Sequence, residues 1–309
     1  MSATDTSSRQ GTSLKLLGQP TLQEYIHFIT EQVVDGDARS RRSVVDEWRE
    51  VNDIYGELEQ SEAGIADSIE VSPLDEALLA RAAEIRDRPD FRFTFDRLPT
   101  EIVMVELEKL VVWQTRIDAD FAEGLQAGLH ASMDAAAILD FSLPPPSPAD
   151  SISVRKLGSN RFQFMSDSSD FRPHAPTLLD ADQVSGFETF GPLWKMVGLG
   201  VGFGSNYLCA IRSEQRLLLH NGHHRAHALL ASGIRHAPCV VQSVTRRDEL
   251  EIAAKRQVLD DPDFYFGAAR PPLLKDYFDP RIVRRMPTWR SQKVIEIGFE
   301  TREIMVAKA

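Results

Sequence analysis

Residues 217–233 read Leu-Leu-Leu-His-Asn-Gly-His-His-Arg-Ala-His-Ala-Leu-Leu-Ala-Ser-Gly, and this stretch carries the clearest structural pattern in the chain. The apolar run at its start ends at the turn dipeptide Asn221-Gly222. A helical pattern begins at once and ends at Gly233, because glycine commonly follows the last turn of a helix. The pattern predicts a strand, a tight turn and a helix in direct succession.

The predicted turn gathers groups that attract anions. The N-terminus of a helix offers backbone N–H groups without intrahelical partners and the positive end of the helix dipole. A glycine there lets the backbone approach a ligand closely, and arginine adds a forked donor of permanent charge. We therefore expect a phosphate or nucleotide site formed by Asn221, Gly222, His223, His224 and Arg225.

A structural reading of the same turn competes with this one. Asn-Gly is a common hairpin turn, and histidine or arginine at the start of a helix can simply face solvent. However, cationic side chains are unfavourable at a helix N-terminus, where the dipole prefers acids. A bound anion would remove this conflict, and the anion site is therefore the favoured interpretation.

Composition limits the class of protein. The chain has 309 residues, of which 42% are hydrophobic and 26% charged, as in an ordinary globular protein. No apolar run approaches the roughly 20 residues of a membrane span, so we expect no membrane partner. The polar residues 1–18 predict a disordered tail rather than a secretory signal. Cys209 and Cys239 lie in apolar runs, which predicts buried thiols and a cytoplasmic location.

Charge divides the sequence into two halves. Residues 1–150 carry 13 Lys and Arg against 29 Asp and Glu, a balance of −16, whereas residues 151–309 carry 22 against 17, a balance of +5. The acidic half would repel nucleic acid, and the basic half would attract phosphate. The net charge of −11 argues against a dedicated DNA-binding protein but leaves a nucleotide ligand open.

Residues 19–95 are expected to form a helical module. Apolar residues recur at helical spacing from Thr21 and again over residues 43–58, and Ser72-Pro73 is typical of the start of a third helix that runs to about Arg86. We expect these helices to pack on the rest of the chain or to form a homodimer.

Residues 96–309 change to a mixed pattern of strands and helices. An insertion at about 130–200 contains a polyproline connector at 143–148, a hairpin at 155–165, a long loop at 167–190 and alternating glycines at 198–204. Asp118 or Asp120 is expected to cap a helix. The remaining predicted elements are strands at 101–106, 207–212, 216–220 and 237–244, a turn followed by another extended piece over 107–116, a helix at 247–259 and a strand pair at 293–306.

This arrangement resembles the ParB/sulfiredoxin superfamily. The matching parts are the leader strand at 101–116, the turn Asn221-Gly-His-His-Arg-Ala226, its helix, a strand near Pro238 and a helix that starts at Asp248. The turn is most similar to that of the free-serine-kinase branch, Asp-Gly-His-His-Arg, with Asn221 in place of the aspartate. The resemblance implies a ParB/sulfiredoxin-like mixed α/β domain at 96–309 and does not extend to residues 1–95. With the helical module predicted from periodicity before this domain, the expected fold class is α+β.

The resemblance also implies a site at the turn. Gly222, His223, His224 and Arg225 would contact the phosphates of ATP, ADP or CTP. His223 stands where sulfiredoxin carries its catalytic cysteine, so reduction of a sulfinic acid is not expected. The Glu-Asn-x-x-Arg segment of ParB is absent near residues 254–259, which argues against a CTP-dependent DNA clamp.

The expected function is that of an ATP- or ADP-dependent phosphotransferase or nucleotide hydrolase that acts on a small-molecule acceptor. His223 and His224 would stabilise the transferring phosphoryl group, and Glu106 or Glu108 on the leader strand would accept a proton. ATP or another nucleoside phosphate and Mg²⁺, held mostly by the phosphates, would be the cofactors.

Two alternatives stay open. The first is a non-catalytic nucleotide-sensing or DNA-associated module of the nuclease type, in which basic side chains at residues 281–290 and Trp289 would meet a nucleic acid. The second is a metal hydrolase, because His223 and His227 stand four residues apart on the predicted helix. His220 and His224 would be further ligands.

Overall fold

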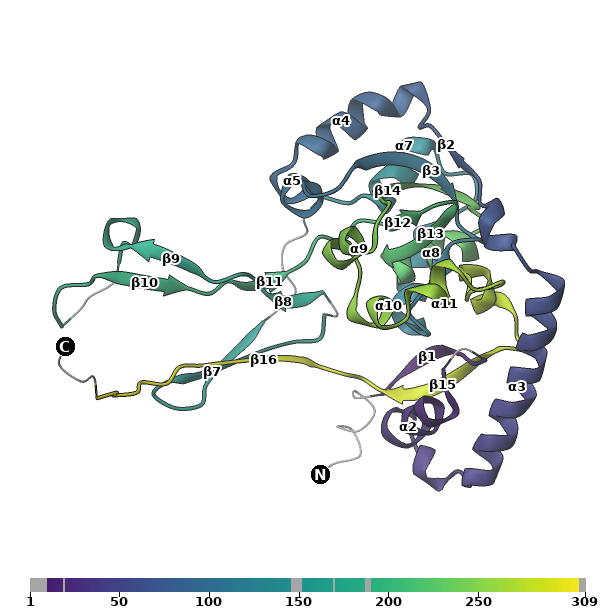
Figure 1. The fold of residues 1–309 in the computed structure, drawn as a ribbon, viewed down its shortest axis with the longest axis horizontal. Coiled ribbons are helices and arrows are strands. Elements are labelled where there is room, and N and C mark those ends of the chain that lie inside the picture. Colours follow the sequence, from purple (N-terminus) through teal and green to yellow (C-terminus); the bar gives the residue numbers. More distant parts are fainter. Residues whose placement is uncertain (1–9, 19, 146–151, 169, 187–189, 306–309) are drawn as a thin grey trace. The chain divides into compact units, whose positions relative to one another are not determined.

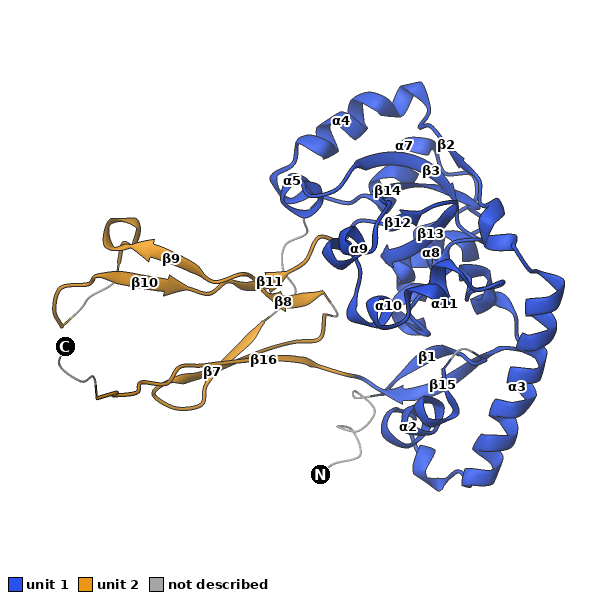
Figure 2. Cartoon of the chain, in the orientation of Figure 1, with its two compact units in different colours: residues 1–146, 206–290 blue, residues 147–205, 291–309 orange. Residues whose placement is uncertain are grey.

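The computed structural model describes residues 10–18, 20–145, 152–168, 170–186 and 190–305. The chain divides into two compact units (Figure 2). Unit 1 comprises residues 1–146 and 206–290, and unit 2 comprises residues 147–205 and 291–309. The chain contains both helices and strands, and the fold is mixed α/β with a curled mixed sheet.

A six-stranded sheet forms the centre of unit 1. Its strands come from buried apolar segments, which are typical of strands covered on both faces. The pairs β12–β14 and β13–β4 are parallel, and the other neighbouring pairs are antiparallel. The order across the sheet is β2 (Val71–Ser72), β3 (Thr100–Glu106), β14 (His236–Val244), β12 (Cys209–Ser213), β13 (Arg216–Asn221) and β4 (Val111–Val112).

Helices cover both faces of this sheet (Figure 1). Because side chains alternate along a strand, Leu217 and Leu219 lie on one face and Cys209 and Val240 on the other. The first face packs under α6 (Ala119–Gln126) and α8 (His223–Ala231), and the second under α4 (Leu79–Asp87) and α5 (Pro89–Phe95). Further helices of unit 1 are α7 (Ala135–Ser142), α9 (Arg247–Ala253), α10 (Arg256–Asp260) and α11 (Pro262–Phe266).

A second sheet of unit 1 corrects the prediction of a disordered tail at residues 1–18. Residues 10–16 form strand β1 (Gln10–Leu16), which lies between β15 (Val283–Trp289) and β5 (Arg116–Asp118) with antiparallel pairing on both sides. Local composition did not predict this strand, because the strands that pair with it lie about 100 and 270 residues away in the sequence. Residues 1–9 lie outside the described residues.

The helices expected at residues 19–95 are present and lie in the same compact unit as the central sheet. Thr21 caps α2 (Leu22–Gln32), and the second expected helix falls within α3 (Arg41–Ser61). Both pack on Ile282 and Met286, which confirms packing on the rest of the chain. A homodimer through these helices stays a prediction.

Two expected helices differ in their limits. The third helix does not start at Ser72, because that residue pairs with Met104 as part of β2, and α4 begins only at Leu79. The helix expected over 247–259 is interrupted at Ala254, whose backbone is extended, and becomes α9 and α10.

Unit 2 is built from short antiparallel pairs. The hairpin expected at 155–165 is confirmed as β6 (Ser153–Lys156) and β7 (Arg161–Ser166). The long loop expected at 167–190 is wrong, because it contains two strands that pair with the glycine-rich segment. These pairs are β8 (Phe171–Pro173) with β11 (Val201–Phe203) and β9 (Thr177–Asp180) with β10 (Lys195–Gly198).

The end of the chain also pairs differently from the expectation. In place of a strand pair over 293–306, one strand, β16 (Lys293–Gly298), pairs with β7. Pro146 to Pro148 of the polyproline connector lie outside the described residues.

The remaining general expectations concern the two cysteines and membrane spans. Cys209 and Cys239 are free and buried as expected, and burial raises the pKa of the Cys209 thiol to about 12. Within the described ranges, none of the helices combines the length and the apolar character that crossing a membrane requires.

Candidate functional site

The strand, turn and helix predicted from residues 217–233 are confirmed as β13, Gly222 and α8 (Figure 1). Gly222 adopts the left-handed conformation, with φ 87° and ψ 24°, which glycine tolerates better than other residues. A Cβ atom at this position would also lie 3.1 Å from the Cα atom of Leu208. The backbone angle therefore favours glycine here, and Leu208, directly before β12, leaves little room for a Cβ atom.

The N-terminus of α8 carries a positive electrostatic potential. Gly222 occupies the N-cap position, so no side chain caps the helix, and its first turn contains no acidic residue. The amides of His223 and His224 point along the helix toward this end without partners inside the helix. Such an end favours an anion.

His223 is buried, with 3% of its surface exposed, and its Nε2 atom has no hydrogen-bond partner among the described residues. Trp113 contacts the imidazole edge-on, with 5.4 Å between ring centroids. Burial, assisted by His224 and His220, lowers the pKa of His223 well below its usual value. An unpaired buried polar atom costs about 1–3 kcal/mol, so this imidazole lowers the stability of the fold as long as Nε2 has no partner.

The imidazole of His224, unlike the Nε2 atom of His223, has a hydrogen-bond partner within the described chain. Its Nε2 atom accepts a hydrogen bond of 3.0 Å from the backbone N–H of Asp118, and Phe121 contacts its ring. Burial lowers its pKa although the Asp118 carboxylate acts in the opposite direction. In the neutral ring the proton is therefore on Nδ1.

Asp118 is the acidic residue that the structure adds to this region. The sequence marked it only as a helix cap, and its Oδ1 atom does accept from the backbone N–H of Phe121 at 3.0 Å, at the start of α6. The same capping geometry turns the backbone of Asp118 toward His224. The sequence thus identified Asp118 as a helix cap, but it could not show that Asp118 lies next to His224 on α8.

Arg225 lies inside the molecule, with 7% of its surface exposed. Its Nη1 atom donates to the carbonyl oxygen of Phe141 at 2.6 Å, and the guanidinium carbon lies 5.1 Å from the centre of the Phe141 ring. These contacts join α8 to α7. Arg225 therefore has a packing role in addition to its predicted contact with phosphate.

The structure does not bring Glu106 and Glu108 to the turn. Glu106 pairs with Lys109 at 3.1 Å, and Glu108 lies 3.5 Å from Arg235. Arg235 follows the C-terminal end of α8, whereas the turn precedes its N-terminus. Among the described residues, the ion pairs of both glutamates are with Lys109 and Arg235, not with residues 221–225.

The histidines of α8 do not converge on one point. His223 contacts Trp113, whereas His227 stacks on Phe278 at 4.7 Å, and burial lowers the pKa of His227 to about 4. Among the residues that the structure describes, no three His, Cys, Asp or Glu side chains are grouped so that they could hold a metal ion. The metal-hydrolase alternative therefore gains no support.

The basic side chains at residues 281–290 are neutralised by acids of the same unit. Each of the four arginines lies within 4.0 Å of a carboxylate, which leaves little positive potential for a nucleic-acid backbone. The pairs are Arg281–Asp279, Arg284–Glu47, Arg285–Glu123 and Arg290–Asp120.

Unit 1 contains cavities near the turn and farther from it. One of about 410 Å³ is lined by residues of α9, α10 and α11, and a second of about 210 Å³ is lined in part by Trp113. Residues 221–225 line neither of them. The Nε1 atom of Trp113 donates to the carbonyl oxygen of His220 at 3.2 Å, and its ring contacts His223, so one residue both lines the second cavity and touches the turn.

No protein-family model, curated protein or solved structure matches this chain. The resemblance to the ParB/sulfiredoxin superfamily therefore depends on the sequence motifs alone.

Proposed function

We propose that the turn at residues 221–225 binds the phosphates of ATP or another nucleoside phosphate. The observation that carries the proposal is the buried Nε2 atom of His223, which has no partner in the described structure and lies at an uncapped helix N-terminus. A phosphate oxygen would accept from the amides at this end and from the imidazole, if Nε2 carries the proton. Gly222 keeps the N-cap position free of a side chain.

The activity proposed for this site is phosphoryl transfer to a small-molecule acceptor, or hydrolysis of the nucleotide. Positioning and charge stabilisation account for most of the catalysis of such reactions, and the α8 N-terminus and His223 would provide both. Asp118, next to His224, takes the place of Glu106 and Glu108 as the carboxylate that would accept a proton.

Mg²⁺ is the metal ion that this activity implies. It commonly binds through the phosphates, water and one or two carboxylates, so it does not need a cluster of protein ligands. Asp118 would be the protein carboxylate available to it. When bound, the ion neutralises charge on the phosphates.

The proposed location is the cytoplasm. Two free and buried thiols, Cys209 and Cys239, suit a reducing compartment.

The test is calorimetric titration with ATP, ADP, CTP and GTP, each with Mg²⁺, of the wild-type protein and the His223→Leu variant. Leucine fills a similar volume without a polar atom, so the variant should fold at least as stably while its nucleotide affinity falls at least tenfold. His227→Phe is the matched control, because it removes a second unpaired imidazole from the same helix and should leave affinity unchanged. Arg225 is unsuitable for this purpose, since its loss also breaks the contact with Phe141.

Two results would refute the proposal. One is a wild-type protein that binds none of the four nucleotides, and the other is a His223→Leu variant that binds them as tightly as the wild type. A readout of thermal stabilisation by nucleotide gives an independent measure of the same binding.

A non-catalytic nucleotide sensor is the second candidate. The observation that favours it is the position of Glu106 and Glu108 away from the turn, beside Lys109 and Arg235. Release of phosphate or ADP during prolonged incubation with ATP and Mg²⁺ would distinguish the enzyme from the sensor, since both bind the nucleotide.

A further inference from the structure

The cavity of about 210 Å³ in unit 1 has one buried cationic group in its wall. It lies among β1, α2, α10, α11 and the segment between β4 and β5. Its volume is below the roughly 300–1,000 Å³ of sites for drug-sized molecules, so a ligand would have to be small. Its lining residues are Lys15, Pro20, Glu24, Trp113, Thr115, Gln257, Phe264, Tyr265 and Pro272.

Lys15 is 7% exposed, and its hydrogen bonding is incomplete. Its Nζ atom donates to Thr115 Oγ1 at 2.8 Å and lies 5.0 Å from the centre of the Phe28 ring. An ammonium has three N–H donors, and a buried ammonium is unfavourable unless it is paired with an anion. Across the described residues, no carboxylate lies within 4.0 Å of this group.

The electrostatic surroundings agree with this description. Burial, assisted by Arg116, lowers the pKa of Lys15 to about 8, although Glu24 on α2 acts in the opposite direction. Lys15 is therefore still mostly protonated at pH 7. The energetic penalty of its burial would be relieved by one negative charge placed in the cavity.

The rest of the wall suits an apolar group. Trp113, Phe264 and Tyr265 supply aromatic faces, and two prolines complete the lining. Two other polar groups of the wall have partners within the chain: Gln257 Nε2 donates to the carbonyl oxygen of Trp113, and Glu24 Oε2 accepts from the backbone N–H and the hydroxyl of Thr21. The donors left for a ligand are the Lys15 ammonium and the hydroxyl of Thr115, which still has its own proton to donate. Two donors and a single positive charge match the two oxygens and single charge of a carboxylate better than a phosphate dianion.

We propose that this cavity binds a small organic carboxylate, with its oxygens on Lys15 Nζ and Thr115 Oγ1 and its apolar body against Trp113 and Tyr265. The inference does not depend on nucleotide binding at residues 221–225. Trp113, which lines this cavity, also contacts His223.

The experiment is a titration of the full chain with benzoate at pH 7, without nucleotide, followed by calorimetry and by tryptophan fluorescence. Benzamide, which has the same shape without the charge, is the ligand control. Lys15→Met removes the ammonium, and Thr115→Val removes the hydroxyl. Lys109→Met is the matched control variant, because Lys109 pairs with Glu106 away from the cavity.

We expect benzoate to bind with a dissociation constant of about 1 mM or lower. Affinity should fall at least tenfold in Lys15→Met and measurably in Thr115→Val, and it should not change in Lys109→Met or in His223→Leu. Unchanged affinity in Lys15→Met, equal binding of benzamide, or no binding of benzoate to the wild type would each overturn the proposal. If Lys15→Met does not fold, as judged by circular dichroism, unchanged affinity in Thr115→Val overturns it.

Discussion

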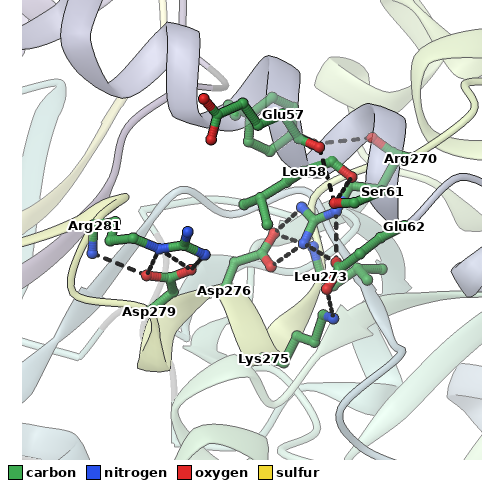
Figure 3. A network of polar contacts seen from close by, with 11 residues as sticks. Glu57, Leu58, Ser61, Glu62, Arg270, Leu273, Lys275, Asp276, Asp279 and Arg281 are labelled. Atoms are coloured by element: carbon green, nitrogen blue, oxygen red, sulfur yellow. Dashed lines mark hydrogen bonds and ion pairs between the residues drawn. The ribbon is translucent and has the colours of Figure 1, made fainter.

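Two clusters of buried polar side chains in unit 1 differ in how completely they are paired. The first surrounds Arg270, which is 1% exposed (Figure 3). Its Nη1 and Nη2 atoms each donate to Asp276 at 2.6 Å, and Nη2 also donates to Glu62 at 2.9 Å. Lys275 binds the other oxygen of Glu62 at 2.7 Å. The network therefore satisfies its charges with groups of the same chain.

The second cluster consists of the histidines of α8. The Nε2 atom of His223 and the Nδ1 atom of His227 are buried without a partner in the described part of the chain. A network that is complete holds α3 to the segment before β15 and needs no ligand. A cluster with unpaired atoms lowers the stability of the fold unless a bound group completes its hydrogen bonds.

The strongest test of this contrast removes one partner of the complete network. Asp276→Leu leaves Arg270 buried with only Glu62 to balance it, and we expect a loss of about 3–5 kcal/mol in the free energy of unfolding. Urea denaturation measures the loss. The double variant Arg270→Met with Asp276→Leu should recover most of it, and a single variant that costs less than about 1 kcal/mol would contradict the description.

The incomplete cluster should make the protein sensitive to mild acid. Histidine in the unfolded chain takes up a proton below about pH 6.5, whereas the pKa of folded His227 lies at about 4. Because the unfolded state binds more protons in this window, stability falls as the pH drops from about 6.5 to 4. His227 alone contributes about 3 kcal/mol, and His223 and His224 act in the same direction. Melting temperatures recorded across the window check the slope, and a flat profile between pH 6.5 and 4.5 would refute it.

Replacing the unpaired imidazole of His227 with an apolar ring should stabilise the fold. In His227→Phe the ring can still stack on Phe278, while the unpaired Nδ1 atom and the proton uptake disappear. We expect a gain of about 1 kcal/mol at pH 7 and a shallower acid slope. The measurement is chemical denaturation at pH 7 and pH 5, and a loss of stability at both pH values would show that His227 has a partner of its own.

The smallest change in stability is expected from an exposed ion pair. Arg285 and Glu123 lie 2.6 Å apart, but both side chains are about half exposed. Arg285→Ala should change the free energy of unfolding by less than about 1 kcal/mol, and added salt should remove the difference. Thermal denaturation at low and high salt tests this, with Glu123→Ala as the reciprocal variant.

Local signals explain what the sequence could predict. An apolar run, Asn221-Gly222 and Gly233 mark the ends of β13 and α8 by short-range backbone preferences, and both elements were found where expected. Thr21 likewise marks the start of α2. These features need no knowledge of distant residues.

Features that depend on distant partners were missed. The strand β1 pairs with residues 283–289, and the strands of residues 167–190 pair with the glycine-rich segment. At the site, the sequence predicted the turn but not its surroundings, because the pairing of β3 with β14 carries Glu106 toward His236. For the same reason Asp118 was recognised as a cap but not as the neighbour of His224.

The central position of β1 has a consequence for biosynthesis. Residue 10 pairs with residue 289, so the N-terminal strand leaves the ribosome long before its partner is made. At a translation rate of about 5–20 residues per second, the delay is on the order of 14–55 seconds. During this time the exposed strand is open to wrong pairing, and a nascent chain arrested before residue 283 should be bound by chaperones more strongly than one arrested after residue 290.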